Sequence, residues 1–174
     1  MGRNGRLSVL VLIGVALAHT VGARERAEPP ALPSTQEVEV LAVMHDTRTQ
    51  QPVVVLEGKR DKRQLVMVIG PTEATSIAVP LQGVVPERPL THDLFLTLFG
   101  RLHAALTRVV INDLRDGIYY ASIEVQAGSN AIELDARPSD AIALAIRAKV
   151  PVLVEDRVFD KSGQFGPAPR RQQI

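Results

Sequence analysis

The 174-residue sequence contains no cysteine and no tryptophan, and aromatic residues make up only 3% of it. Without cysteine the chain cannot form disulfides, thiolate metal sites or a cysteine nucleophile, so any catalysis must use oxygen groups, nitrogen groups or a bound metal. The shortage of aromatic rings disfavours modules that bind nucleic acids by stacking bases. Histidine is also scarce, at four residues, and no HExxH, HxH or Walker-type glycine loop occurs to identify a metal or phosphate site.

The composition that is present, 45% hydrophobic and 22% charged, is typical of one globular domain. Segments with little to bury predict where this domain begins and ends. Residues 24–36, RERAEPPALPSTQ, are rich in proline and charge and indicate a flexible linker. The domain is therefore expected over residues 37–160, followed by a Gly/Pro-rich tail over residues 161–174.

The amino terminus has the pattern of an export signal. Arg3 and Arg6 precede the apolar run LSVLVLIGVALA (residues 7–18), and VGA (residues 21–23) supplies small residues for a signal peptidase. We expect a signal peptide over residues 1–23 and a periplasmic or extracellular mature protein. The run is shorter than the roughly 20 apolar residues of a spanning helix, so no stable membrane span is expected after cleavage. An uncleaved amino-terminal membrane anchor is the alternative.

Cleavage after Ala23 would change the net charge of the chain. Losing Arg3 and Arg6 leaves 18 of the 20 Lys and Arg residues against 19 Asp and Glu, which gives a formal charge of −1 in place of +1. The mature protein would then have no general basicity. A surface that binds a polyanion would have to be a local patch.

Strand-like patterns dominate the expected domain. They occur in seven segments, which are EVEVLAVMHD, PVVVLEG, QLVMVIG, RVVINDL, GIYYASIEVQ, NAIELDA and VPVLVED. The second and third are expected to form a hairpin. The fourth to sixth are separated by the turn signals Asp116-Gly117 and Gly128-Ser129-Asn130, which predict an antiparallel meander with one face packed on helices.

Three segments have helical patterns. PTEATSIAVPL predicts a short helix that Pro80 should end or kink. Leucines at helical spacing predict a second helix over residues 92–106, with Thr91 as its N-cap. AIALAI also fits the alternation of a strand, but its alanines and the preceding Ser139-Asp140 favour a largely buried helix over residues 140–148. Together the elements predict a single α+β domain with an antiparallel or mixed β-sheet, in which a β-meander packs against about three helices.

Several of these segments also resemble a known family. VIGPTEATSIAVPLQG, ERPLTHDLF and IELDARPSDAIALAIRAKVPVLVED occur in the order seen in the bifunctional nuclease domain family, whose name comes from members with both DNase and RNase activity. The resemblance covers roughly residues 37–160. It implies a nuclease-like hydrolase that cleaves DNA or RNA phosphodiesters, with a divalent metal such as magnesium or manganese, and the amino-terminal pattern predicts that this hydrolase is exported. Nucleic acid is the implied partner.

Phosphodiester cleavage needs charge stabilisation on the phosphate, an activated water and usually one or two divalent cations held by carboxylates. The candidates for these roles are His92, Asp93, Asp135, Arg137 and Asp140, with Glu73 as a weaker candidate. Arg137 could grip phosphate through its fork of donors, and His92 could act as a base. Asp135 and Asp140 could share a cation. If both segments form one site, His92 or Asp93 should lie within about 8 Å of Asp135, Arg137 or Asp140.

The same residues have a structural explanation. Asp140 can stabilise a helix dipole, and Arg137 can pair with Asp135 or Asp140. Asp93 and Glu73 can each lie in the first turn of a helix. The alternative function is accordingly a non-catalytic binding or assembly module of the cell envelope that keeps the fold. A small sheet with many apolar strand residues also makes a homo-oligomer an expectation in either case.

Overall fold

The computed structural model of the chain describes residues 34–163. The predicted signal peptide, and nearly all of the predicted linker and tail, lie outside these residues. Within them no helix is long and apolar enough to cross a membrane. The elements follow in the order β1 (Thr35–His45), β2 (Pro52–Gly58), β3 (Gln64–Val68), α1 (Pro71–Leu81), α2 (Thr91–Arg101), β4 (Ala104–Arg115), β5 (Ile118–Ala127), β6 (Asn130–Ala136), α3 (Pro138–Ala148), β7 (Val152–Glu155) and α4 (Asp156–Ser162).

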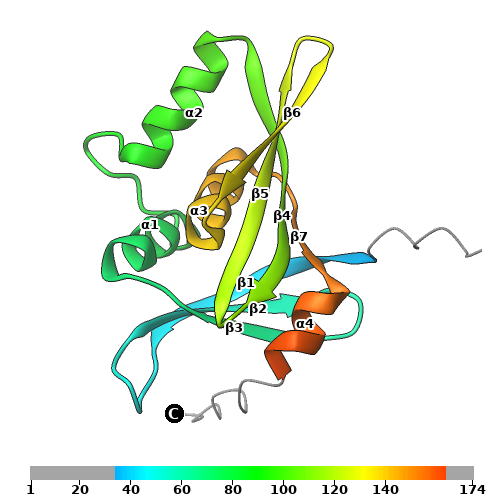
Figure 1. The fold of residues 1–174 in the computed structure, drawn as a ribbon. Helices are drawn as coiled ribbons and strands as arrows, with labels where there is room; N and C mark the ends of the chain where they lie inside the picture. Colours follow the sequence, from blue (N-terminus) through cyan, green and yellow to red (C-terminus); the bar gives the residue numbers. More distant parts are fainter. Residues whose placement is uncertain (1–33, 164–174) are drawn as a thin grey trace, which may run out of the picture. The chain divides into compact units, whose positions relative to one another are not determined.

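The described strands form one seven-stranded sheet in the order β3-β2-β1-β7-β4-β5-β6. β7 pairs in parallel with β4, and the other neighbouring strands are antiparallel. Helices α1, α2 and α3 lie together on the left of the sheet in Figure 1, whereas α4 lies on the right. The predicted class, a single α+β domain with a mixed sheet, is confirmed.

The hairpin and the meander form as predicted. β2 pairs with β3, and β5 pairs with both β4 and β6. Asp116 and Gly117 connect β4 to β5 with φ values of 51° and 78°. Two positive φ values define the tight turn whose twist matches that of paired strands, which explains why Asp-Gly predicts it. The turn thereby fixes the register of the longest strand pair in the domain.

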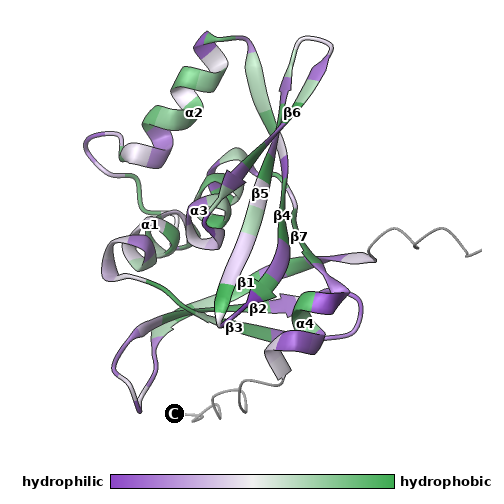
Figure 2. Ribbon diagram, in the orientation of Figure 1, coloured by the Kyte–Doolittle hydropathy of each residue, from purple (hydrophilic) through white to green (hydrophobic). Residues whose placement is uncertain are grey.

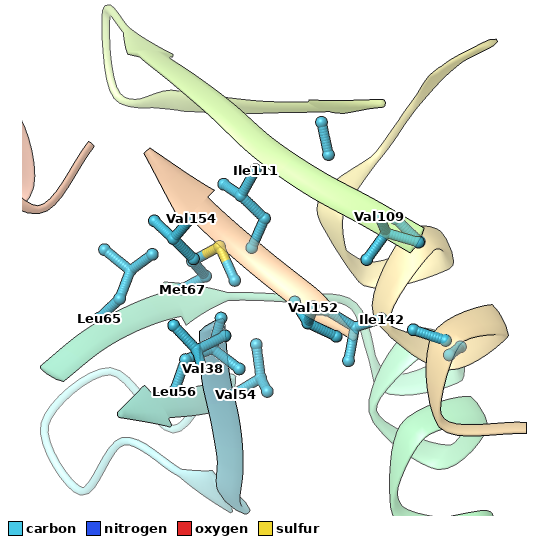
Figure 3. Close-up of a cluster of buried hydrophobic side chains, with 14 of the residues drawn as sticks. Val38, Val54, Leu56, Leu65, Met67, Val109, Ile111, Ile142, Val152 and Val154 are labelled. Carbon is cyan, nitrogen blue, oxygen red and sulfur yellow. The ribbon is translucent and has the colours of Figure 1, made fainter. Parts of the chain in front are cut away.

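The sheet curls around its core. The Tyr119 hydroxyl at the start of β5 donates a hydrogen bond to the Val66 carbonyl of β3 at 3.4 Å, although four strands separate β5 from β3 in the sheet order. Buried apolar side chains fill the enclosed space (Figure 3). They come from six strands and from α1, α3 and α4, and include Val38, Val54, Leu56, Leu65, Met67, Val109, Ile111, Ile142, Val152 and Val154.

Helix α3 is the central helix of the domain. It packs on β4 and β5 and also contacts α1 and α2. Its residues 141–145 are all buried, as expected for a helix that is apolar nearly all round. The helix begins at Pro138, two residues before the predicted start, because proline suits the first turn, where its missing N–H is not needed.

Two predictions about α2 are wrong. The helix ends at Arg101, and Leu106 is instead buried in β4, opposite Val125. His103 has a left-handed φ of 55°, which stops the helix before the strand begins. Leucines at every fourth position continue past this stop, so their spacing could not locate it. Leu90, rather than Thr91, is the N-cap residue, and its backbone N–H donates to Asp93.

Helix α4 was not expected from the sequence. It is short, and it buries only Val158 and Phe159. The β2–β3 turn holds it in place, because the Arg63 guanidinium lies over the Phe159 ring at 4.6 Å and pairs with Asp156 at 2.5 Å. These contacts join residues that are more than 90 positions apart. A seven-residue helix fixed by distant partners has too little periodicity of its own to be predicted.

Candidate active site at three helix starts

The first turns of α1, α2 and α3 repeat one arrangement. Each has an acidic residue at its third position, and these residues are Glu73, Asp93 and Asp140. A carboxylate in the first turn is stabilised by the positive end of the helix dipole. Because α3 contacts both α1 and α2, the three helices can be linked by side chains near these starts.

A line of polar side chains joins all three helices. Arg137 pairs through Nη1 with Glu73 of α1 at 3.0 Å, and through Nε with Asp140 of α3 at 2.6 Å. The other carboxylate oxygen of Asp140 lies 3.2 Å from Nε2 of His92 in α2. The predicted proximity of the two sequence segments is therefore confirmed for His92 and Asp140. We call Glu73, Arg137, Asp140 and His92 the helix-start cluster.

Local sequence explains how two members of the helix-start cluster are positioned. Pro138 restricts the residue before it to extended backbone, and Arg137 has φ −69° and ψ 141°, which suits its place as N-cap of α3. Gly70 precedes Pro71 in the same way at the start of α1. A Cβ at Gly70 would overlap the Glu73 carboxylate, so glycine leaves room for Glu73 at this helix start.

The cluster keeps opposite charges in contact at neutral pH. Partial burial acts to raise the pKa of Asp140, but the hydrogen bonds from Arg137 and His92 outweigh it and hold that pKa below 3.8. The hydrogen bond to Asp140 in turn raises the pKa of Arg137. Arg137 remains 65% exposed, whereas the Glu73 and Asp140 side chains are 19% and 31% exposed. Two largely covered carboxylates thus hold a guanidinium at the surface.

The lowered pKa of Asp140 predicts how stability depends on pH. A carboxyl group whose pKa is lower in the folded state contributes stability above its unfolded value of 3.8, and loses it as pH falls through the folded value. We expect the difference in unfolding free energy between wild type and Asp140→Asn to shrink between about pH 5 and pH 2. Urea unfolding across this range measures it. A constant difference would show that the pKa of Asp140 is not lowered by folding.

His92 is held in an orientation that limits its chemistry. Its side chain is 13% exposed, and Nδ1 is buried without a hydrogen-bond partner among residues 34–163. The tautomer with hydrogen on Nε2 would donate to Asp140 and leave the Nδ1 lone pair facing the interior. In this arrangement water does not reach Nδ1. His92 therefore fits a residue that positions Asp140 better than the predicted base.

Asp93 belongs to a separate network on the inner side of the same helices. It accepts hydrogen bonds from the Leu90 backbone N–H and from Nε of Arg147, each at 2.9 Å. Arg147 is only 7% exposed, and its Nη1 also donates to the carbonyls of Ser76 and Ala143. Arg147 thus ties α3 to both α1 and α2. Sequence reasoning missed it, although a single arginine in an otherwise apolar helix was a usable signal.

Asp135 is exposed on β6 and is not part of the helix-start cluster. It lies opposite Ser122 in β5, whereas its neighbour Leu134 lies opposite Ile123. Adjacent residues of a strand point to opposite faces, so Asp135 and Leu134 face different sides of the sheet. Among residues 34–163 Asp135 makes no hydrogen bond or ion pair with the helix-start cluster, and the cation site that Asp135 and Asp140 could share stays a prediction.

A cleft of about 550 Å³ opens between the starts of α1 and α2. Its lining contains four hydroxyl side chains and the residues next to Glu73 and His92 in sequence, and consists of Pro71, Thr72, Thr75, Ser76, Pro89, Leu90 and Thr91. The four members of the helix-start cluster are not in this lining. The cleft offers hydrogen-bonding groups beside the cluster rather than a pocket that encloses it.

The cluster does not have the ligands of a metal site. Among the described residues, no group of three or more histidine, aspartate or glutamate side chains is placed to hold a metal ion. Both carboxylates of the cluster are already paired with Arg137, which would repel a cation. The side-chain arrangement therefore does not fit the divalent metal that the sequence led us to expect.

This α+β domain, with charged residues at three helix starts, is similar in sequence to proteins of a known family. The chain belongs to the bifunctional nuclease domain family, whose model matches residues 54–166. An uncharacterized protein of Mycobacterium tuberculosis is 40% identical over 131 residues, which cover 75% of this chain and 78% of that protein. Bifunctional nuclease 1 of Oryza sativa subsp. indica is 28% identical over 123 residues, which cover 69% of this chain but 37% of the plant protein.

Proposed function

We propose that this protein hydrolyses phosphodiester bonds of DNA or RNA at the helix-start cluster, with Arg137 as the residue that contacts phosphate. The main support is the geometry of Arg137. Glu73 pairs with its Nη1 and Asp140 pairs with its Nε, while 65% of its side chain stays open to solvent. A fork of donors that is oriented before binding suits a phosphate group. Membership of the bifunctional nuclease domain family supports the same substrate class.

The residues of the cluster would have different tasks. Arg137 would donate hydrogen bonds to the phosphate oxygens and stabilise the negative charge that develops on them during cleavage. Glu73 and Asp140 would fix the direction of the guanidinium, and His92 would fix Asp140. These side chains lie at the amino termini of α1, α2 and α3, which add positive partial charge. The hydroxyl-lined cleft beside the cluster would accommodate the neighbouring part of the strand.

The divalent metal stays a prediction, and the two carboxylates of the helix-start cluster, as paired with Arg137, leave it no free ligand. Magnesium or manganese would supply charge stabilisation or an activated water if bound. Movement of Arg137 away from Glu73 and Asp140 would first have to free their carboxylates.

The test is a cleavage assay on labelled single-stranded and double-stranded DNA and RNA, each with magnesium, manganese or a chelator. Wild type is expected to cleave at least one substrate, and Asp140→Asn is expected to cleave it more slowly. Asp135→Asn is the matched control, because Asp135 is an exposed carboxylate of the same segment outside the cluster. Absence of cleavage under every condition would contradict the proposal, as would equal rates for wild type and Asp140→Asn.

The second candidate function is a non-catalytic binding or assembly module of the cell envelope. Two observations favour it, namely the buried Nδ1 of His92 and the lack of a metal-ligand group among residues 34–163. Such a module would bind nucleic acid or another partner without turnover. Binding of an oligonucleotide that remains intact during the cleavage assay would support this function over the first.

We further propose that the protein is exported. The support is the charged start, the apolar run over residues 7–18 and the small residues VGA at 21–23. The mature amino terminus is expected at or near Arg24, in the periplasm or outside the cell. Mass spectrometry of the native protein measures it directly. An intact Met1 or Gly2 would instead support the amino-terminal membrane anchor.

A further inference from the structure

Gly70 lies directly against the helix-start cluster, although it has no side chain to contribute to it. It is the N-cap residue of α1 and precedes Pro71. A Cβ at this position would overlap Oε2 of Glu73 and would lie 3.2 Å from the carboxylate carbon. Oε1 of the same carboxylate pairs with Nη1 of Arg137 at 3.0 Å. Glu73 therefore lies against the Gly70 backbone through one oxygen and holds Arg137 through the other.

The backbone conformation does not require glycine at position 70. Gly70 has φ −74° and ψ 161°, which any residue adopts, and a residue before proline favours this extended region. Gly83, Gly117 and Gly128 differ, because their φ values of 67°, 78° and 60° lie in the left-handed region. The space that the Glu73 carboxylate occupies therefore accounts for glycine here. Glycine is also common at N-caps, which is a second explanation to be tested.

The two partners of Arg137 act on its guanidinium in different ways. Asp140 accepts a hydrogen bond from Nε, which lies on the Nε–Cζ bond, so this contact alone does not oppose rotation of the group about that bond. Glu73 pairs with Nη1, which lies off the bond, and does oppose the rotation. Figure 2 shows the neighbouring helix α2 green over much of its length, so beyond its first turn α2 has few polar groups that could replace Glu73.

We propose that Gly70 is a positioning residue for the contact of Arg137 with phosphate. Because Gly70 has no Cβ, Glu73 can fold back against it and hold the guanidinium in one orientation. The atom that a Cβ would overlap is the end of a flexible side chain, so a substitution would displace Glu73 and leave the backbone in place. The effect of Gly70 on cleavage rests on the proposed function, whereas its effect on the orientation of Arg137 does not.

NMR of the whole chain tests the orientation of Arg137 without any substrate. Rotation about its Nε–Cζ bond is expected to be faster in Gly70→Ala and in Glu73→Ala than in wild type. Gly70→Ser separates space from capping, because serine is a strong N-cap but also has a Cβ, and it too is expected to speed the rotation. Gly100→Ala is the matched control, since a Cβ there meets nothing within 4 Å. Rotation as slow as in wild type in both Gly70 variants would overturn the proposal.

A double-mutant cycle in the cleavage assay tests whether Gly70 acts through Glu73. Gly70→Ala and Glu73→Ala are each expected to lower kcat/KM by about 10-fold, because the guanidinium loses its alignment with phosphate. The double variant is expected to stay within about twofold of Glu73→Ala, since no carboxylate is left to displace. Losses that multiply to about 100-fold would overturn the proposal. A wild type that does not cleave would contradict the proposed function, and the rotation of Arg137 would still decide the role of Gly70.

Discussion

Replacement of Arg147 by methionine is expected to lower the free energy of unfolding by about 2–4 kcal/mol, because it removes a buried guanidinium that pairs with the partly exposed Asp93 and donates to two carbonyls. Arg147 is 7% exposed and joins three helices through Asp93 and the carbonyls of Ser76 and Ala143. Methionine fills similar space but leaves the Asp93 carboxylate and the Ser76 carbonyl without this donor. Urea unfolding of the variant and wild type measures the loss.

Arg88→Met provides the comparison for this substitution. Arg88 is exposed in the segment just before α2, so its replacement is expected to change the unfolding free energy by less than about 0.5 kcal/mol. If Arg147→Met were as stable as Arg88→Met, the contacts of Arg147 with Asp93 and the two carbonyls would not hold the three helices together. The position of His92 in α2 would then need another explanation.

Replacement of Arg137 by lysine is expected to lower kcat/KM for phosphodiester cleavage by roughly 10- to 100-fold, because lysine keeps the charge but loses the planar fork of donors. The same change is expected to lower the unfolding free energy by less than about 1 kcal/mol, since ion pairs of an exposed side chain contribute little. Arg137 is 65% exposed, unlike Arg147. Cleavage activity should therefore depend mainly on Arg137, the N-cap residue of α3, and stability should depend mainly on Arg147 within α3.

Arg108→Lys is the control for this experiment. Arg108 is 50% exposed and pairs with Glu124 on the sheet, so it resembles Arg137 in exposure and partner but lies outside the helix-start cluster. Its replacement is expected to leave kcat/KM within about twofold of wild type. A stability loss at Arg137 with unchanged turnover would assign that residue to the fold alone.

Local signals predicted most of the sheet. The hairpins were predictable because alternating apolar residues and Asp116-Gly117 determine strand pairing over short distances. The end of α2 was not, because leucine spacing is the same in a helix that continues and in one that stops at His103. Helix α4 was missed for a related reason. It depends on Arg63, which is distant in sequence and looks like part of a polar turn.

The candidate site could be predicted only in part. His92, Arg137 and Asp140 were found because two charged segments stood next to helix starts, and the structure brings them together. Asp135 was grouped with them because it is close in sequence, but strand alternation cannot be followed reliably up to the end of β6. Arg147 was missed because its partners are 54 and 71 residues away. Tertiary contacts, rather than the local sequence pattern, place Asp93 and Arg147 in a network separate from the helix-start cluster.

The central claim is that the starts of α1, α2 and α3 together bind the phosphate backbone of nucleic acid. NMR titration of the whole chain with a short phosphorothioate oligonucleotide, which resists cleavage, tests it most directly. The backbone amides of all three first turns are expected to shift together, with weaker shifts in Arg137→Lys. Shifts confined to α4 and the β2–β3 turn, which carry other arginines, would contradict the account, as would no shift at any concentration.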